Sequence, residues 1–198
     1  MMFATLRKAY EKVLTLADRP WAEKALAGLS FAEASFFPIP PDPLLLAMGA
    51  GRPDRALRFA MVTTLASVAG ALFGWLLGAF LMDTVGAALL DLYDGDRVLW
   101  GKVEVWYAEW GVAAVVVAAL TPIPFKVFTI ASGALGLPLA PFLAACAAGR
   151  GIRFGAEGIL LRLFGAKVKN WMDRWFEWAA VIFAVLLVGG FLLLGALE

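Results

Sequence analysis

A proline cluster inside an apolar run is the feature that most constrains how this chain can fold. Four prolines and two carboxylates interrupt the apolar run over residues 29–50: Pro38, Pro40, Pro41, Pro43, Glu33 and Asp42. Proline lacks a backbone N–H and clashes with the preceding turn, so a helix cannot continue through this cluster. Broken backbone at membrane depth persists only where protein buries it or a wet cavity borders it. The run therefore predicts a re-entrant hairpin, with two short helical arms joined at a broken tip.

The composition places this hairpin in a membrane protein. Of the 198 residues, 62% are hydrophobic and 17% are charged, whereas soluble domains are less apolar and more charged. The net charge of +1 gives no reason to expect nucleic-acid binding. With no histidine and one cysteine, the chain has too few soft ligands for a zinc or copper site, and we expect no cofactor. The sequence also lacks the motifs of P-loop ATPases and intramembrane hydrolases, so an enzyme is not expected.

A second segment repeats the proline signature. Thr121-Pro-Ile-Pro-Phe-Lys126 places Pro122 and Pro124 at another tip. An apolar run long enough to span the membrane follows each tip, over residues 59–81 and 139–164. We expect the two tips to approach one another within the membrane and to bury each other.

Loop charges orient these two units. The loops at 51–58 and 162–174 are basic and the loop at 83–96 is acidic, so the positive-inside rule places the first two in the cytoplasm. The amino terminus is then cytoplasmic and the carboxyl terminus external. The units at 29–81 and 112–164 enter from opposite faces, as in the inverted repeats of transporters.

The predicted fold is an all-α integral membrane protein with a single membrane domain over residues 1–198. Three segments flank the repeats. Residues 1–28 form amphipathic helices that lie on the membrane surface or cover the bundle, and both interpretations stay open. Residues 82–111 form an external loop and an interfacial helix, and residues 165–198 an interfacial segment and a last span. The alternative, five ordinary spans, would require the proline segments to cross as helices.

Five ionisable side chains fall at predicted membrane depth, and they are the candidate substrate-binding or transport residues: Glu33, Asp42, Lys126, Arg150 and Arg153. Unpaired charges are expensive there, so they should share one polar interior. Arg153 and Glu157 have the spacing of an intrahelical ion pair. Arg150 has no local partner, which suits an anionic ligand or a hairpin carboxylate. Glu33 and Asp42 are either a proton-titrating or cation-attracting pair, or counterions that hold Lys126 and Arg150.

A glycine stripe lies in the first full span. Gly70, Gly74 and Gly78 recur every four residues, which lets another helix pack closely. The stripe could serve an internal contact or a homodimer.

Four motifs in order resemble those of the DedA/VTT (SNARE-associated Golgi protein-like) superfamily, in its YqaA-like bacterial branch. They are Glu33-Ala-Ser-Phe-Phe-Pro-Ile-Pro-Pro-Asp42, Ala66-Ser-Val-Ala-Gly-Ala71, Thr121-Pro-Ile-Pro-Phe-Lys-Val-Phe-Thr-Ile130 and Gly149-Arg-Gly-Ile-Arg-Phe154. The resemblance implies a bacterial inner-membrane protein with two opposed hairpins. It also implies a role in moving phospholipids or polyprenyl-phosphate lipids and in envelope homeostasis. Lys126 stands near a position where many members carry arginine, and the second-hairpin arginine before the proline is replaced here by Leu120-Thr121.

The first functional hypothesis is ATP-independent translocation of such lipids, with their phosphate headgroups as partners. Lys126, Arg150 and Arg153 would bind phosphate, while Glu33 and Asp42 would couple to protons or gate. The alternatives are an ion- or proton-coupled exporter of small solutes and a non-transporting membrane scaffold.

Overall fold

The computed structural model describes residues 21–82, 98–121, 123–165 and 167. Within these ranges the chain forms helices and no strand. Three predictions lie outside the described residues: the helices expected before residue 21, the acidic loop at 83–96 and the last span after residue 167.

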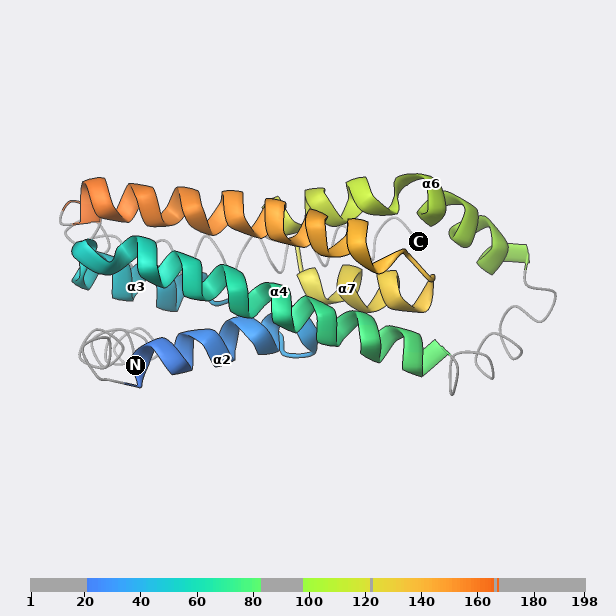
Figure 1. Cartoon of the computed structure of the whole chain (residues 1–198), viewed down its shortest axis with the longest axis horizontal. Helices are drawn as coiled ribbons and strands as arrows, with labels where there is room; N and C mark the ends of the chain where they lie inside the picture. The colour runs from blue at the N-terminus through green and yellow to red at the C-terminus, as the bar shows by residue number, and fades with distance from the viewer. Residues whose placement is uncertain (1–20, 83–97, 122, 166, 168–198) are drawn as a thin grey trace, which may run out of the picture.

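Two long helices run the length of the molecule, with shorter helices at either end (Figure 1). The long helices are α4 (Ala56–Leu81) and an unlabelled helix over residues 139–165, drawn in orange. At one end lie α2 (Ala22–Ser35) and α3 (Asp42–Gly51), and a 3-10 turn, η1 (Pro53–Arg55), leads from α3 into α4. At the other end lie α6 (Val98–Leu120) and α7 (Phe125–Ala134).

The helices break at both proline segments. α2 ends at Ser35, and the chain is non-helical until α3 begins at Asp42 with a proline in its first turn, where no N–H is needed. α6 ends at Leu120 and α7 begins at Phe125. The first arm is longer than expected, because α2 already starts at Ala22, inside the segment that we assigned to the amino-terminal amphipathic helices.

The region before the second break differs from the expectation. We expected an interfacial helix up to residue 111 and a separate apolar arm from 112, but α6 runs without interruption through both. The reason is local, because residues 98–120 contain no proline that would end the helix.

Two described helices are long and apolar enough to cross a membrane, Pro53–Leu81 and Trp100–Leu120. The first corresponds to the predicted span at 59–81. The second lies where a short arm was expected. The helix over residues 139–165, predicted as a span, is not one of the two; it carries Arg150, Arg153 and Glu157 at its middle.

The glycine stripe of α4 lies against α2 and α7. A Cβ on Gly70 would meet the backbone carbonyl of Phe31 in α2, and one on Gly78 would meet the carbonyl of Ile130 in α7. A Cβ on Gly74 would meet both the side chain of Thr129 and the carbonyl of Ala34. The absence of side chains therefore lets both shorter helices approach the same long one at backbone distance.

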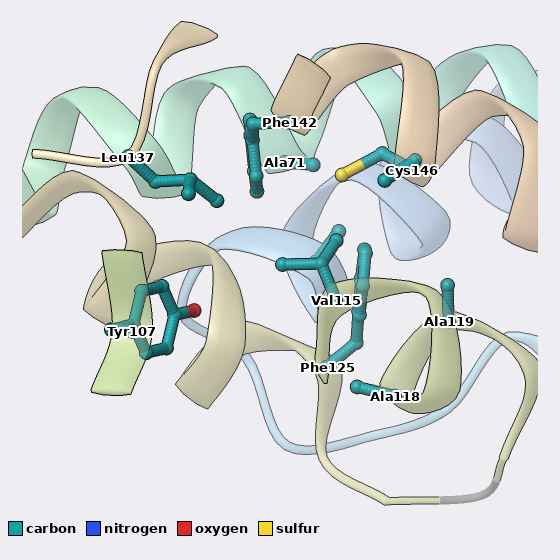
Figure 2. Packing of buried hydrophobic residues seen from close by; sticks show 11 residues of the cluster. Ala71, Tyr107, Val115, Ala118, Ala119, Phe125, Leu137, Phe142 and Cys146 are labelled. Atoms are coloured by element: carbon teal, nitrogen blue, oxygen red, sulfur yellow. The ribbon is translucent and has the colours of Figure 1, made fainter. Parts of the chain in front are cut away.

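The largest hydrophobic core joins α4, α6, α7 and the helix over residues 139–165. Figure 2 shows side chains of these elements pointing into one shared space; its buried members include Ala71, Val115, Phe125, Phe142 and Cys146. A second core packs α2 and α3 on α4 and the 139–165 helix, through Leu26, Leu45, Met48, Phe59 and Phe154.

A glycine turn sends the chain from α7 back along the molecule. Gly136 has φ 66°, a left-handed conformation that glycine adopts without strain. The N–H of Leu137 donates to the Ser132 carbonyl at 2.8 Å and that of Gly136 to the Gly133 carbonyl at 3.2 Å, which together form a Schellman cap. This cap directs the following helix toward the centre, where its charged residues lie.

Candidate functional site

The two helix breaks meet at the centre of the molecule. The Thr129 hydroxyl in α7 donates to the Ala34 carbonyl near the end of α2, over 2.8 Å. Glu33 of α2 and the ring of Phe125, in the first turn of α7, both contact the guanidinium of Arg150. The contact between the breaks is therefore polar as well as apolar.

Arg150 and Glu33 form a buried ion pair across this contact. Arg150 Nη2 lies 2.8 Å from Glu33 Oε2, with side-chain exposures of 3% and 10%. The guanidinium also lies 4.0 Å from the centroid of the Phe125 ring and 5.4 Å from that of Phe154. Cation–π contacts of this kind stabilise a charge that has left water. Arg150 Nε is buried without a hydrogen-bond partner in the described part of the chain, so this N–H group of the guanidinium can still donate a hydrogen bond.

Arg153, one turn further along, connects both breaks. Its Nε lies 3.1 Å from Asp42 Oδ1, and its Nη2 contacts the same oxygen. Its Nη1 donates to the Thr121 carbonyl at the end of α6. The predicted intrahelical pair with Glu157 is present at 3.7 Å, although it is the longer of the two ion pairs that Arg153 makes. Arg153 therefore holds the start of α3 and the end of α6 to one helix.

Glu157 is linked to the first hairpin through Arg153. Arg153 forms ion pairs with both Asp42 and Glu157, so two acids and one arginine form a compact triad. Glu157 Oε2 is buried and has no hydrogen-bond partner among the described residues. Sequence spacing related Glu157 to Arg153 but did not reveal that Asp42 pairs with the same arginine.

Three carboxylates and two guanidinium groups thus form one central cluster: Glu33, Asp42, Glu157, Arg150 and Arg153. Such groups are costly to desolvate, so a cluster of this kind depends on complete pairing. It can respond to an anion that competes for an arginine, or to a proton that neutralises a carboxylate.

Lys126 differs from the two arginines. It lies in the first turn of α7, is half-buried, and makes no ion pair with any residue in the described ranges. The hypothesis that hairpin carboxylates act as counterions of Lys126 and Arg150 therefore fits Arg150 alone, since Asp42 pairs with Arg153 instead.

The proline tips themselves are not mutually buried, contrary to expectation. Ile39 and Ile123 are 51% and 46% exposed, and the buried contacts come from residues beside the tips, such as Ser35 and Phe125. The prolines explain why the tips need not bury each other. Proline has no backbone N–H, so the tips have few donors that would require a hydrogen-bond partner. Pro38 and Pro124 are exposed, Pro40 is half-buried and Pro41 is buried, while Pro122 lies outside the described residues.

An apolar groove opens between α6 and α7. It has a volume of about 310 Å³ and is lined by Trp106, Trp110, Ala113, Ala114, Val117 and Phe128. No charged side chain lines it. The groove offers space to an apolar chain rather than to a polar headgroup.

Sequence reasoning missed three features of the cluster: the Phe125 ring beside Arg150, the Thr121 carbonyl, and the pairing of both Asp42 and Glu157 with Arg153. A signal for Phe125 exists in its position directly after the second Pro-Ile-Pro. The Thr121 carbonyl has no signal in side-chain type, because any residue supplies a carbonyl.

The sequence matches the family model of the VTT domain over residues 37–162, a range that includes both breaks and most of the central cluster. An uncharacterised protein of Haemophilus influenzae is 34% identical over 180 residues, which cover 89% of this chain and 93% of that protein. An uncharacterised protein of Histophilus somni is 33% identical over 188 residues, covering 93% of this chain and 95% of that protein. No solved structure matches the chain.

Proposed function

Because this chain belongs to the VTT-domain family, we propose that it moves phosphate-bearing lipids across the bacterial inner membrane without ATP. Membership of the family and two apolar helices of spanning length indicate a membrane protein with a transporter-like role. The substrates we propose are phospholipids or polyprenyl phosphates, whose headgroups carry the anion that buried arginines can bind.

The proposed architecture is an inverted repeat of two re-entrant hairpins. In support, α2 with α3 and α6 with α7 lie toward opposite ends of the molecule, and both breaks lie near its centre (Figure 1). Each pair would enter and leave on one side of the membrane, with its tip at the midplane. The long helix that follows each pair would cross completely.

The observation that carries the proposal is the buried Glu33–Arg150 pair between the two breaks. A phosphate group offers the same kind of acceptor oxygens as Glu33, so it can replace that carboxylate on Arg150. Lys126, which lies beside Phe125 and is free of ion pairs within the described ranges, would meet the headgroup first. Exchange of one anion for another avoids leaving Arg150 uncompensated in a dry interior.

The acyl chains would stay on the apolar side. The groove lined by Trp106, Trp110 and Phe128 has no charged lining and is open to the surface of α6 and α7. An acyl chain fits this chemistry, and the headgroup would then project toward the tip of the second hairpin.

The test is headgroup translocation by the purified full chain in proteoliposomes. We expect Arg150→Ala and Asp42→Ala to abolish translocation and Lys126→Ala to reduce it at least tenfold. Arg150→Lys should retain less activity than its charge suggests, because lysine loses the two-pronged geometry that matches phosphate. Lys102→Ala is the matched control, since Lys102 is exposed on α6 and should leave the rate unchanged.

Folding is measured separately by thermal stability in detergent. The Lys126→Ala variant separates a loss of phosphate binding from a loss of folding, because it removes no ion pair among the described residues. Wild-type translocation by folded Arg150→Ala and Lys126→Ala variants would refute the phosphate-binding role.

A second candidate is a proton-coupled exporter of small solutes, which the excess of one carboxylate over the arginines favours. Solute flux driven by a pH gradient, without movement of lipid headgroups, would support it. Absence of both activities in folded protein would favour a scaffold.

A further inference from the structure

Basic side chains gather at the end of the molecule where α2 and α4 begin and where α3 and the helix over residues 139–165 end (Figure 1). Direct packing joins these ends. A Cβ on Gly165 would lie 2.6 Å from Cγ of Pro53, and Arg58 Nη2 lies 2.8 Å from Glu23 Oε2. The described members of this basic surface are Lys24, Arg52, Arg55, Arg58, Arg162 and Lys167.

The carboxylates within the basic surface do not neutralise it. Asp54 is 65% exposed and lies 3.5 Å from Arg52 and 3.9 Å from Arg55, and Glu23 pairs with Arg58. Three further bases are exposed and make no ion pair in the described ranges: Lys24, Arg162 and Lys167. Among the described residues, six bases against two acids leave an excess of four positive charges at this end.

The rest of the described chain carries no such excess. The exposed charged side chains of α6 are Lys102, Glu104 and Glu109, which together are negative. The central cluster has three carboxylates for two guanidinium groups. Positive charge is therefore concentrated at one end, where it attracts anions.

Exposed apolar side chains border these bases. Trp21, Leu163 and Phe164 are 48%, 67% and 46% exposed, and Lys167 Nζ lies 6.0 Å from the centroid of the Phe164 ring. Tryptophan and long basic side chains are typical of the boundary between acyl chains and headgroups, because each has an apolar body and a polar tip. The mixture of bases and apolar groups favours a lipid surface over a soluble anion.

We infer that the basic surface binds the headgroups of anionic phospholipids in the leaflet next to it. Guanidinium and ammonium groups donate hydrogen bonds to phosphate oxygens, and the apolar side chains contact the acyl chains. The ion pairs with Asp54 are long and exposed, so they are weak competitors for the headgroups. The inference requires that the chain lies in a membrane, but it does not rest on lipid translocation.

Electron paramagnetic resonance of spin-labelled phospholipids tests the inference with the full chain in phosphatidylcholine bilayers. The spectra measure how strongly each labelled lipid associates with the protein. We expect anionic phosphatidylglycerol to associate roughly twofold or more strongly than phosphatidylcholine. About 1 M salt should reduce this preference, because the Debye length is then about 3 Å.

The three exposed bases allow a variant that breaks no ion pair among the described residues. Lys24→Gln/Arg162→Gln/Lys167→Gln should lose at least half of the preference for phosphatidylglycerol. The charge-conserving variant Lys24→Arg/Arg162→Lys/Lys167→Arg should keep the preference. Lys102→Gln, on α6, is the control outside the basic surface. Thermal stability in detergent checks that every variant is folded.

Cross-linking gives the location of the bound lipid. Phosphatidylglycerol with a photoreactive headgroup should label residues 52–58 and 162–167 more than residues 98–104. Equal association of the two lipids with wild-type protein, as expected if the surface serves a soluble acidic partner, would overturn the inference. A preference unchanged in the glutamine variant, or labelling mainly at 98–104, would also overturn it. None of these results depends on whether the protein translocates lipid, so the proposed function stands or fails separately.

Discussion

Two ion pairs of equal length illustrate how burial changes the meaning of a contact. Arg150–Glu33 and Arg58–Glu23 both have N–O distances of 2.8 Å. The first pair is almost fully buried, whereas the Arg58 side chain is 64% exposed. In water, solvation and salt weaken an ion pair, but in a dry interior the loss of one partner leaves the other charge uncompensated.

We therefore predict very different costs for breaking the two pairs. Glu33→Gln should lower the free energy of unfolding by about 3–5 kcal/mol, because Arg150 would keep a buried charge without its carboxylate. Glu23→Gln should cost less than about 1 kcal/mol, since water can replace the lost partner of Arg58. Unfolding in mixed detergent micelles measures both. The double variant Glu33→Leu/Arg150→Met should recover part of the loss, and equal costs at the two pairs would contradict the prediction.

At the scale of elements, α4 is the surface on which α2 and α7 are assembled. Its glycines permit two helices to approach at backbone distance, and the approach sets where Glu33 and Phe125 lie. Ser30 and Ser35 reinforce the α2 contact through hydrogen bonds to the carbonyls of Thr63 and Gly70, at 2.7 and 3.0 Å. The position of the central charged cluster thus depends on these uncharged glycine and serine residues.

We predict opposite effects on stability for alanine substitutions at a glycine inside this helix contact and at one outside it. Gly78→Ala should destabilise the protein by about 1–3 kcal/mol, because its Cβ meets the Ile130 carbonyl and the backbone of α7 would have to move. Gly28→Ala, in α2, has nothing within 4 Å of the new Cβ and should stabilise by up to about 1 kcal/mol through helix propensity. Thermal unfolding of both variants is the measurement, and a neutral Gly78→Ala would show that α7 does not depend on this close approach.

At the scale of the whole molecule, both breaks reach the centre from opposite ends, and Arg153 contacts each of them. Their exposed residues Ile39 and Ile123 lie beside this centre rather than at the ends of the long helices. A membrane-embedded molecule of this shape would keep both tips away from either bulk water phase.

Accessibility and orientation can be predicted together. We expect maleimide to label Ile39→Cys and Ile123→Cys slowly from both sides of the membrane in inside-out and right-side-out vesicles. Arg55→Cys, in the exposed η1 turn, should react rapidly from the cytoplasmic side, and reporters fused at residue 90 should be active outside. The native Cys146 is buried, so it gives little background. Rapid labelling of the two tips from opposite water phases would end the re-entrant interpretation.

How much of this molecule can be predicted from its sequence depends on how local the deciding interaction is. Proline positions predicted both helix breaks, the apolar run predicted α4, and the four-residue glycine spacing predicted a close helix contact. Local patterns did not predict that α6 would remain continuous, since a change from amphipathic to apolar composition does not by itself end a helix. The same patterns suggested buried tips, whereas the structure buries their neighbours.

The sequence by itself determined which residues are charged at depth, where the helices break, and where two helices can touch. These follow from properties of single residues: proline lacks a donor, glycine lacks a side chain, and arginine keeps its charge. Only the tertiary structure decided that Glu33 pairs with Arg150 and Asp42 with Arg153, across more than a hundred residues of chain. It also decided that Asp42 and Glu157 share Arg153 and that Lys126 makes no ion pair within the described ranges. Which acid meets which base depends on the rotation and approach of packed helices, and those are set by all their contacts together.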